Sequence, residues 1–467
     1  MALSNPHLET NAIAEFQAEL QGDVISRNGP KYDEARAVWN GMVDKYPALI
    51  AQCTGVGDVV QTVTFAREND LLVAVRGGGH NVAGTAVCDD GIVIDLSEMN
   101  GVVVHPDDRT ARVQAGATWG EMDRETQHFG LVTPGGVISM TGVAGLTLGG
   151  GYSHLRRKYG LTADNLRSVN IVTADGEFLT ANEEQHEDLF WALRGGGGNF
   201  GVVTSFEFEL HELGPEVMHA GTAYPMKEAP SVLRQWRDFM QDAPDEITSD
   251  ALLWSIPEHE HFPPDLHGTP VIITAGVYAG PVDEGRQALQ PLREFKEPLL
   301  DLSRVDPYTD VQQQFDPFFQ QGVRAYWKSR YLNSLDERAI ETIVEYASDR
   351  PSPRSPVPIR ARGGKLNRID SEATAFWDRR SPFQLSIDAT WTLPEGDEEN
   401  IEWTREFWEA MEPHASDTMY FNFASGDEDE EIIRTTFGQN YTRLVEVKTE
   451  YDPENLFQLN TNIQPTT

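Results

Sequence analysis

Cysteine and long apolar runs are both scarce in this sequence. Only two cysteines, Cys53 and Cys88, occur among 467 residues. A disulfide scaffold and a metal site built on thiolates are therefore not expected. No stretch approaches the roughly 20 apolar residues that span a bilayer, and the first residues lack the charged and apolar regions of a secretory signal. We therefore expect a cytoplasmic protein with no membrane partner.

Basic residues are also scarce. The chain has 37 Lys and Arg against 74 Asp and Glu, which gives a net charge of −37. Such a charge repels nucleic acid and anionic membranes, so neither is expected as a partner. The acidic residues are spread over the whole chain and form no tail, and salt screens their mutual repulsion. This pattern predicts a protein adapted to high salt, from a halophilic organism.

Several catalytic signatures are missing. The 12 histidines form no H-E-x-x-H motif, and neither a Walker-type phosphate loop nor a G-x-S-x-G elbow occurs, so no metal site is predicted. Residues 196–201 satisfy G-x-G-x-x-G, but they follow a predicted helix and precede a predicted strand. A Rossmann fingerprint has the reverse order. We therefore expect a glycine loop between packed elements there.

Length and composition predict two or three domains. A chain of 467 residues is too long for one core, and its composition changes after Gly214-Pro215. In the glycine- and valine-rich first part, Thr118 and Glu121 form a capping box that opens a helix through about His128. Other elements predicted there are strands at 48–52, 71–76, 91–96, 101–105, 111–115 and 202–210, helices at 57–69 and 187–193, and a hairpin at 168–179.

The second part is richer in Trp, Phe, Pro and charge. The predicted elements are helices at 231–242, 335–348 and 401–411, strands at 270–278 and 383–393, and a proline-rich loop at 350–358. The last segment, 420–467, is expected to start as a β-type segment. It should continue as a helix around 429–450, which Asp452-Pro453 ends.

Two glycine-rich segments attract attention. In the first, Arg76-Gly77-Gly78-Gly79-His80-Asn81, three glycines let backbone N–H groups approach an anionic group, and Arg76 can support its charge. His80 is either an ordinary surface or core residue or a nucleophile, because a neutral imidazole is nucleophilic. The second segment, 133–152, has seven glycines between Gly135 and Gly151. They disfavour a helix or strand and predict close backbone approach to a partner.

Ordered motifs over most of the chain resemble one known family. R-G-G-G-H-N, T-P-G-G-x-x-x-x-T-G-V-A-G-L-T-L-G-G-G and L-F-W-A-L-R-G-G-G-G-N-F-G-V-V-T are similar to those of berberine-bridge-enzyme-type FAD-linked oxidases. Near the end, Y-F-N-F, N-Y-x-R-L, Y-D-P-x-N-x-F and N-T-N-I resemble the C-terminal module of that group. The group shares the vanillyl-alcohol-oxidase (PCMH-type) FAD domain.

The resemblance implies an α+β fold. An N-terminal extension, 1–29, would precede a PCMH-type FAD-binding domain of two subdomains at 30–213. A substrate-binding domain at 214–419 would have an antiparallel sheet flanked by helices. A C-terminal module at 420–467 would return to the FAD domain.

The resemblance also assigns the cofactor site by matching position. His80 would be bonded to the flavin 8α-methyl, the R-G-G-G loop would hold the pyrophosphate, and Thr141–Gly145 would line the flavin. The FAD-binding residues implied are Arg76, Gly77, Gly78, Gly79, His80, Asn81, Gly84, Thr141, Gly142, Gly145, Gly151, Val203, Asn460 and Asn462.

One departure from the family bears on the attachment. Many relatives have a cysteine in the second glycine-rich segment that makes a second bond to flavin C6. That position falls near Ile138 here, so the resemblance implies attachment through His80 alone. This pattern resembles the monocovalent branch that includes 6-hydroxy-D-nicotine oxidase.

The reaction implied is oxidation of an alcohol, a sugar or a cyclic amine by hydride transfer to FAD. O₂ or another acceptor would reoxidise the flavin. Tyr420 is the candidate base, although Phe423 replaces the second tyrosine of the family's Y-x-N-Y motif; a tyrosine that only packs at a domain junction is the alternative. Tyr326 and Tyr441 are reserves. A noncovalent reductase of the UDP-N-acetylmuramate type and a flavin-binding protein without turnover stay open, as do the substrate and the oligomeric state.

Overall fold

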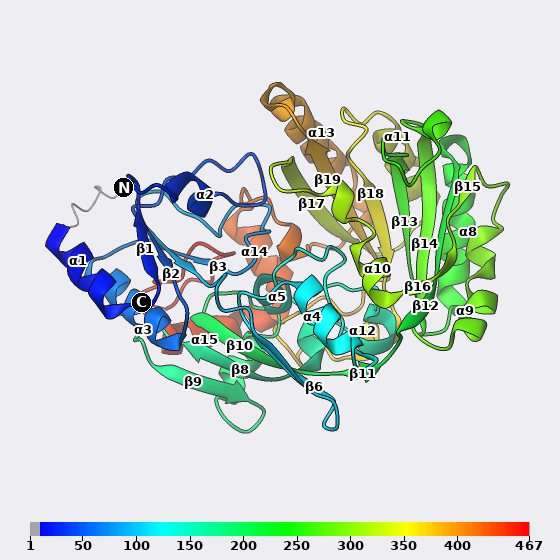
Figure 1. Ribbon diagram of the computed structural model, residues 1–467. Coiled ribbons are helices and arrows are strands. Elements are labelled where there is room, and N and C mark those ends of the chain that lie inside the picture. Colours follow the sequence, from blue (N-terminus) through cyan, green and yellow to red (C-terminus); the bar gives the residue numbers. More distant parts are fainter. Residues whose placement is uncertain (1–9, 467) are drawn as a thin grey trace.

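The chain folds into two domains that lie side by side (Figure 1). The structure is a computed structural model and describes residues 10–466. The first domain contains the N-terminal half of the chain and its last segment. The second domain is built around one large antiparallel sheet.

The first domain begins with a four-stranded sheet in the order β1-β2-β4-β3. Its strands are β1 (Asp23–Ser26), β2 (Leu49–Gln52), β3 (Val73–Arg76) and β4 (Ile92–Asp95). The last three are parallel, and such strands are buried on both faces, which explains their short apolar runs. The helix α3 (Val56–Glu68) connects β2 to β3, as predicted.

Residues expected to be an N-terminal extension belong to this sheet. The strand β1 pairs antiparallel with β2, and α1 (Thr10–Glu19) packs on α3 by stacking Phe16 on Phe65 with ring centroids 4.1 Å apart. Within the expected N-terminal extension, 1–29, α1 and β1 thus pack on the first domain, while residues 1–9 lie outside the described part. An amphipathic helix of ten residues gave too weak a sequence signal.

The first domain also has a sheet of five antiparallel strands, in the order β5-β6-β10-β8-β9. The capping box is confirmed, because Thr118 and Glu121 close it at the start of α4. The hairpin of β8 and β9 is confirmed as well. The elements are β5 (Val102–His105), β6 (Thr110–Gln114), α4 (Trp119–Gln127), β7 (Leu131–Val132), β8 (Leu166–Val172), β9 (Phe178–Asn182), α7 (Glu187–Ala192), β10 (Val202–Glu209) and β11 (His211–Glu212).

The second glycine-rich segment differs from the prediction, because it contains a short helix, α5 (Val143–Leu148). Burial of Val143 and Leu148 and a hydrogen bond of 2.6 Å from the Thr147 hydroxyl to the Val143 carbonyl support this turn. The helix ends where Gly150 and Gly151 adopt φ angles of 105° and 86°, which favour glycine. Tertiary packing here outweighs low helix propensity.

The second domain is an eight-stranded antiparallel sheet. Apolar residues on alternate strand positions pack against α8 (Ala229–Asp242), α11 (Glu337–Ser348) and α13 (Asp397–Ala410). The opposite residues therefore face the other side of the sheet. The strands are β12 (Glu216–Pro225), β13 (Ile247–Ser255), β14 (Pro270–Tyr278), β15 (Leu300–Asp301), β16 (Arg304–Pro307), β17 (Arg324–Leu332), β18 (Val357–Ala361) and β19 (Phe383–Trp391).

Smaller helices join the main elements. They are α2 (Tyr32–Arg36), α6 (Arg156–Tyr159), α9 (Val282–Ala288), α10 (Tyr308–Gln313) and α12 (Gly364–Arg368). One prediction was too long: the proline-rich loop at 350–358 ends earlier, because Val357 and Pro358 already belong to β18.

The last segment returns to the first domain (Figure 1). Its start is a 3-10 helix, Phe421–Phe423, and not a strand, so the prediction of a β-type start was wrong. The single predicted helix is two, α14 (Glu430–Phe437) and α15 (Tyr441–Tyr451), because Gly438 has a φ of 52° and packs directly on Trp377. The fully buried Lys448 binds Asp452 at 2.6 Å and the Asn199 carbonyl at 2.8 Å, which fixes α15 to the glycine loop at 196–201.

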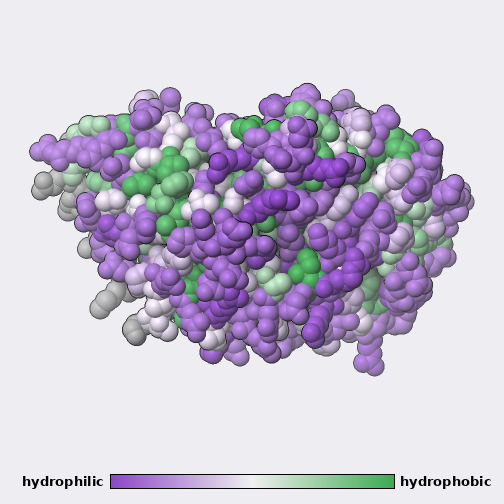
Figure 2. Space-filling view, turned by 90° about the horizontal axis from the view of Figure 1, so that it is seen from below, coloured by the Kyte–Doolittle hydropathy of each residue, from purple (hydrophilic) through white to green (hydrophobic). Residues whose placement is uncertain are grey.

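The surface is predominantly hydrophilic. Figure 2 shows polar side chains over most of one face, with only small scattered apolar patches. Within residues 10–466, no helix is long and apolar enough to cross a membrane. The same residues contain no cluster of three or more His, Cys, Asp or Glu side chains that could hold a metal ion.

Candidate active site

A cavity of about 630 Å³ lies where the two domains meet. Both glycine-rich segments, the loop at 196–199 and the last segment line one side of it. The inner face of the eight-stranded sheet of the second domain lines the other side. The predicted residues that reach this cavity are Gly77, Gly78, Gly79, His80, Asn81, Thr141, Gly142, Gly145, Val203, Tyr420, Asn460 and Asn462.

Three predicted cofactor residues lie behind the wall and do not line the cavity. The Arg76 guanidinium binds both oxygens of Asp95, at 2.6 and 3.2 Å. Gly84 packs on Val43 with a φ of 67°, and Gly151 packs on Thr162. These residues hold the loops in place, and the charge of Arg76 is already balanced by a buried carboxylate.

The two glycine-rich segments touch through their backbones. A Cβ atom on Gly78 would lie 2.5 Å from the Gly142 amide nitrogen, and one on Gly77 would lie 2.8 Å from the Ala115 carbonyl. Only glycine permits this approach. By contrast, a Cβ on Gly145 would meet nothing within 4 Å. The result is a continuous backbone wall with an open face, which fits a flat ring system and a phosphate chain.

His80 lies at the end of the first segment, in a half-buried position. Its ring stacks on Trp39 with centroids 4.3 Å apart and an interplanar angle of 16°. Burial lowers the pKa of His80 to about 4, so the imidazole is neutral near pH 7. Its Nε2 atom has no hydrogen-bond partner among residues 10–466. A buried, neutral and unpartnered ring nitrogen is suited to form a bond to a ligand.

The position expected for a second attachment is apolar. Ile138 lines the cavity, is 8% exposed and packs in a cluster with Trp39 and Trp327. Both cysteines are buried in the core of the first domain instead, at Cys53 beside β2 and Cys88 near β4. Neither lines the cavity.

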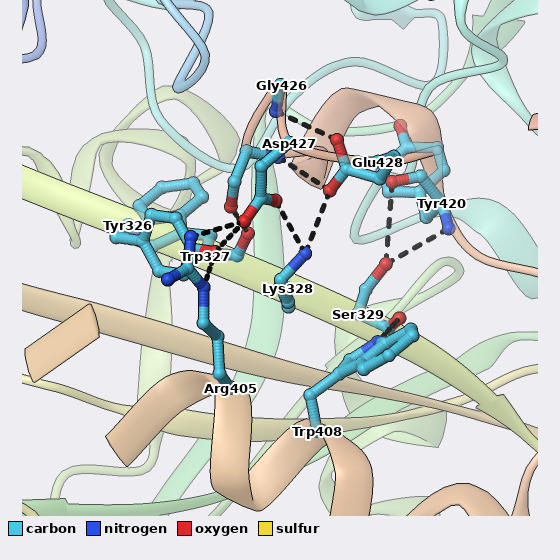
Figure 3. Close-up of polar contacts among 11 residues, drawn as sticks. Tyr326, Trp327, Lys328, Ser329, Arg405, Trp408, Tyr420, Gly426, Asp427 and Glu428 are labelled. Atoms are coloured by element: carbon cyan, nitrogen blue, oxygen red, sulfur yellow. Dashed lines mark hydrogen bonds and ion pairs between the residues drawn. The ribbon is translucent and has the colours of Figure 1, made fainter. Parts of the chain in front are cut away.

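Tyr420 projects into the cavity from the start of the last segment. Its phenolic oxygen accepts hydrogen bonds from the Asn422 amide at 2.8 Å and from the Tyr152 backbone N–H at 3.2 Å. Burial raises the pKa of Tyr420, so the phenol is protonated near neutrality. Figure 3 shows that the Ser329 hydroxyl holds the Tyr420 backbone, accepting from its N–H at 3.0 Å. Tyr420 is therefore fixed by both domains.

The loop after Tyr420 is bound to the second domain by five residues that we call the anchor cluster: Tyr326, Lys328, Arg405, Asp427 and Glu428 (Figure 3). The Lys328 ammonium binds Asp427 at 2.8 Å and Glu428 at 3.3 Å. Burial opposes the ionisation of Asp427, but hydrogen bonds from Lys328, Tyr326 and Arg405 lower its pKa to about 2. Of these five residues, Glu428 lines the cavity, and the other four hold the loop from behind.

The two reserve tyrosines lie outside the cavity. The Tyr326 hydroxyl donates to Asp427 at 2.6 Å within the anchor cluster. Tyr441 begins α15 and packs near Phe437, with ring centroids 6.5 Å apart. Tyr420 is the one of the three that lines the cavity.

Four polar residues that line the cavity, three of them on the sheet of the second domain, were missed by sequence reasoning. Arg360 on β18, Asp388 on β19, Asp250 on β13 and His154 all line the cavity. Burial raises the pKa of Asp388 to about 6, despite the opposing charge of Arg360. A signal existed, because polar residues alternate with apolar ones in Phe383–Trp391, but the partner strands could not be known from the sequence.

Two family descriptions match the chain. Residues 47–182 match the FAD binding domain, and residues 419–464 match the family described as berberine and berberine like. YgaK of Bacillus subtilis (strain 168), an uncharacterized FAD-linked oxidoreductase, is 32% identical over 96% of this chain and 98% of its own. The (R)-6-hydroxynicotine oxidase of Paenarthrobacter nicotinovorans is 30% identical over 96% and 97%.

Solved structures share the fold over the whole chain. The 6-hydroxy-D-nicotine oxidase of Arthrobacter nicotinovorans has a TM-score of 0.86 at 29% identity and covers 96% of this chain and 98% of its own. Chitooligosaccharide oxidase has a TM-score of 0.85 at 22% identity, covers 98% and 100%, and supports the fold alone. The expected α+β fold with a PCMH-type FAD-binding domain is confirmed.

The backbone wall, the neutral, half-buried His80 and the likeness over nearly the full length agree with one another. They establish FAD as the cofactor and oxidoreduction as the class of reaction. The chain is a member of the berberine-bridge-enzyme-like FAD-linked oxidoreductases.

Proposed function

We propose that the protein holds FAD by a single bond to His80 and oxidises the CH–OH or CH–NH group of a small molecule. The observation that carries the proposal is the unpartnered Nε2 of His80 at the end of the glycine loop. A neutral imidazole has a free electron pair, which attachment to the flavin 8α-methyl requires. The apolar Ile138 at the position of a second attachment supports a single bond.

The remaining parts of the cavity have separate tasks in this proposal. The backbone amides of 77–79 bind the pyrophosphate, and the open face of α5 at Gly145 receives the ring system. When bound, FAD would supply the acceptor for the hydride that leaves the substrate, with O₂ as the final oxidant. The polar residues on the sheet of the second domain bind and orient the substrate.

Tyr420 in its phenolate form is proposed to accept the proton that leaves the substrate oxygen or nitrogen. Two N–H donors point at its oxygen and stabilise the phenolate, whereas burial favours the protonated phenol. The proton transfer therefore becomes easier as pH rises. Names of relatives place cyclic amines and oligosaccharides among the compounds to test, together with secondary alcohols.

Acid precipitation tests the attachment. The wild-type pellet should keep its flavin absorbance and show a fluorescent band on a denaturing gel. In His80→Ala the flavin should pass into the supernatant, while gel filtration under native conditions still shows bound flavin. Release of flavin from the wild type would favour a noncovalent reductase of the UDP-N-acetylmuramate type. An oxygen-consumption screen over the three compound classes then separates an oxidase from a flavin-binding protein without turnover.

A further inference from the structure

Arg360 is a buried cation in the wall of the cavity opposite the FAD cradle, by which we mean the two glycine-rich segments proposed to hold FAD. We propose that it is the centre of a subsite that binds a carboxylate group, so that the compound oxidised is an anionic alcohol or amine, such as a hydroxy acid. This inference rests on the proposed function, because it names the substrate class for the same cavity.

The sheet register places Arg360 in the middle of the polar wall. It lies on β18 between Asp250 of β13 and Gln384 of β19, which are its direct neighbours across the strands. Its side chain is on the inner face and lines the cavity, and the residue is only 6% exposed. The guanidinium carbon lies 5.0 Å from the centre of the Phe423 ring. Phe423 in turn packs edge-on against Tyr420, with centroids 4.9 Å apart.

No carboxylate of the described residues forms a direct ion pair with Arg360. Among residues 10–466 it makes one hydrogen bond, from Nη1 to the neutral Gln384 side chain at 2.9 Å, and no ion pair within 4.0 Å. The other cavity arginine, Arg156, donates to Asp250 and to the carbonyls of Ser249, Ser153 and Ala361. A buried arginine is normally paired, because an uncompensated buried charge is strongly destabilising.

The nearby acidic residues do not provide the missing partner. Asp250 is bound to Arg156. Asp388 accepts a hydrogen bond from the Ser386 hydroxyl and, within residues 10–466, makes no hydrogen bond or ion pair with Arg360. His154 is neutral near pH 7, because burial lowers its pKa to about 4. Arg360 is thus the cationic group on the β-sheet wall of the cavity that is left for a ligand.

The shape of the group favours a carboxylate. A guanidinium offers five N–H donors in a planar fork that matches two carboxylate oxygens, and here one nitrogen already binds Gln384. The Phe423 ring supports the charged plane from one side. Trp254 and Trp327 supply apolar surface in the same cavity for the rest of the molecule.

Titration of the flavin-loaded enzyme with benzoate and with benzamide tests the subsite. The two probes have nearly the same shape, and only benzoate has the charge. Binding is followed by the change in flavin absorbance and by the melting temperature. We expect benzoate to bind at least about tenfold more tightly, because hydrogen bonds to charged groups are stronger than neutral ones.

Variants assign the effect to one side chain. Arg360→Gln should lose at least about tenfold in benzoate affinity and leave benzamide binding nearly unchanged. Arg360→Lys keeps the charge without the fork and should give an intermediate value. Arg167→Gln, at an exposed position of β8, makes the same change in net charge and should bind benzoate like the wild type.

Equal affinity for the two probes, or unchanged benzoate binding in Arg360→Gln, overturns the carboxylate subsite. Acid-stable flavin content is recorded for every variant, and it tells a misfolded variant from a folded one. It also separates the two proposals, since the bond at His80 persists if only the subsite is wrong. A substrate screen that pairs mandelate with mandelamide and follows anaerobic flavin bleaching extends the test to turnover.

Discussion

Replacement of Gly145 by alanine should have opposite effects on the stability of the cofactor-free protein and on its affinity for FAD. Gly145 lies inside α5, where an added Cβ meets no protein atom within 4 Å. Alanine is better than glycine in a helix by roughly 0.5–1 kcal/mol. The cofactor-free protein should therefore unfold at the same or a slightly higher temperature.

The cofactor-bound state should respond in the opposite direction. If the ring system lies against the open face of α5, the new methyl group occupies space that the ligand needs. Overpacking of this kind costs about 1–3 kcal/mol, which corresponds to a dissociation constant raised roughly 5- to 150-fold. His80→Ala is the suitable background, because there the flavin can be removed and its rebinding followed by fluorescence quenching.

Gly57→Ala provides the matched control. Gly57 lies at an exposed position in α3, and a Cβ added there also meets nothing within 4 Å, so it tests the helix effect without a ligand nearby. FAD affinity should be unchanged in this variant. If Gly145→Ala also rebinds FAD as tightly as its parent, the cofactor does not lie against α5, and the proposed cradle is wrong.

Three further outcomes are expected. Tyr420→Phe should slow anaerobic flavin reduction by roughly 10²–10⁴-fold and abolish the rise of its rate with pH, whereas Tyr441→Phe should reduce its flavin like the wild type. Equal rates in Tyr420→Phe and the wild type would make Tyr420 a packing residue. The melting temperature should rise from low to molar KCl, because salt screens a net charge of −37, and a flat or falling curve would contradict adaptation to salt. The pKa of Asp388 is raised from 3.8 to about 6, so between these pH values the folded protein holds a proton that the unfolded chain has released. The stability of the wild type relative to Asp388→Asn should therefore fall as pH rises from about 4 to about 6. A difference in melting temperature between the two proteins that does not change with pH would refute this.

Local signals in the sequence were sufficient for much of the first domain. The capping box at Thr118 and Glu121 and the hairpin of β8 and β9 depend on neighbouring residues only, and both are present. The glycines of the cradle could be found because close contact between backbones requires glycine, and the clusters of glycine are visible in the sequence. The helix α5 could not, since burial of Val143 and Leu148 outweighs the local preference of its glycine.

Non-local contacts account for what was missed. Whether Arg76 is free depends on the parallel register that sets it beside Asp95, and no local pattern specifies that register. Arg360 and Asp388 meet in one cavity because β13, β18 and β19 are adjacent, although more than 100 residues separate β13 from β18. The alternation within each strand was visible, but the order of the strands was not.

The return of the last segment to the first domain has a consequence for biosynthesis. Residues 420–462 contribute Tyr420, Asn460 and Asn462 to the cavity, and Lys448 locks them to the loop at 196–201. The second domain, by contrast, is one continuous stretch of chain and can fold while translation continues. The domain that is made first is thus completed last, and a ribosome that stalls before residue 420 leaves a polypeptide that has its second domain but lacks the part of the cavity wall that the last segment provides.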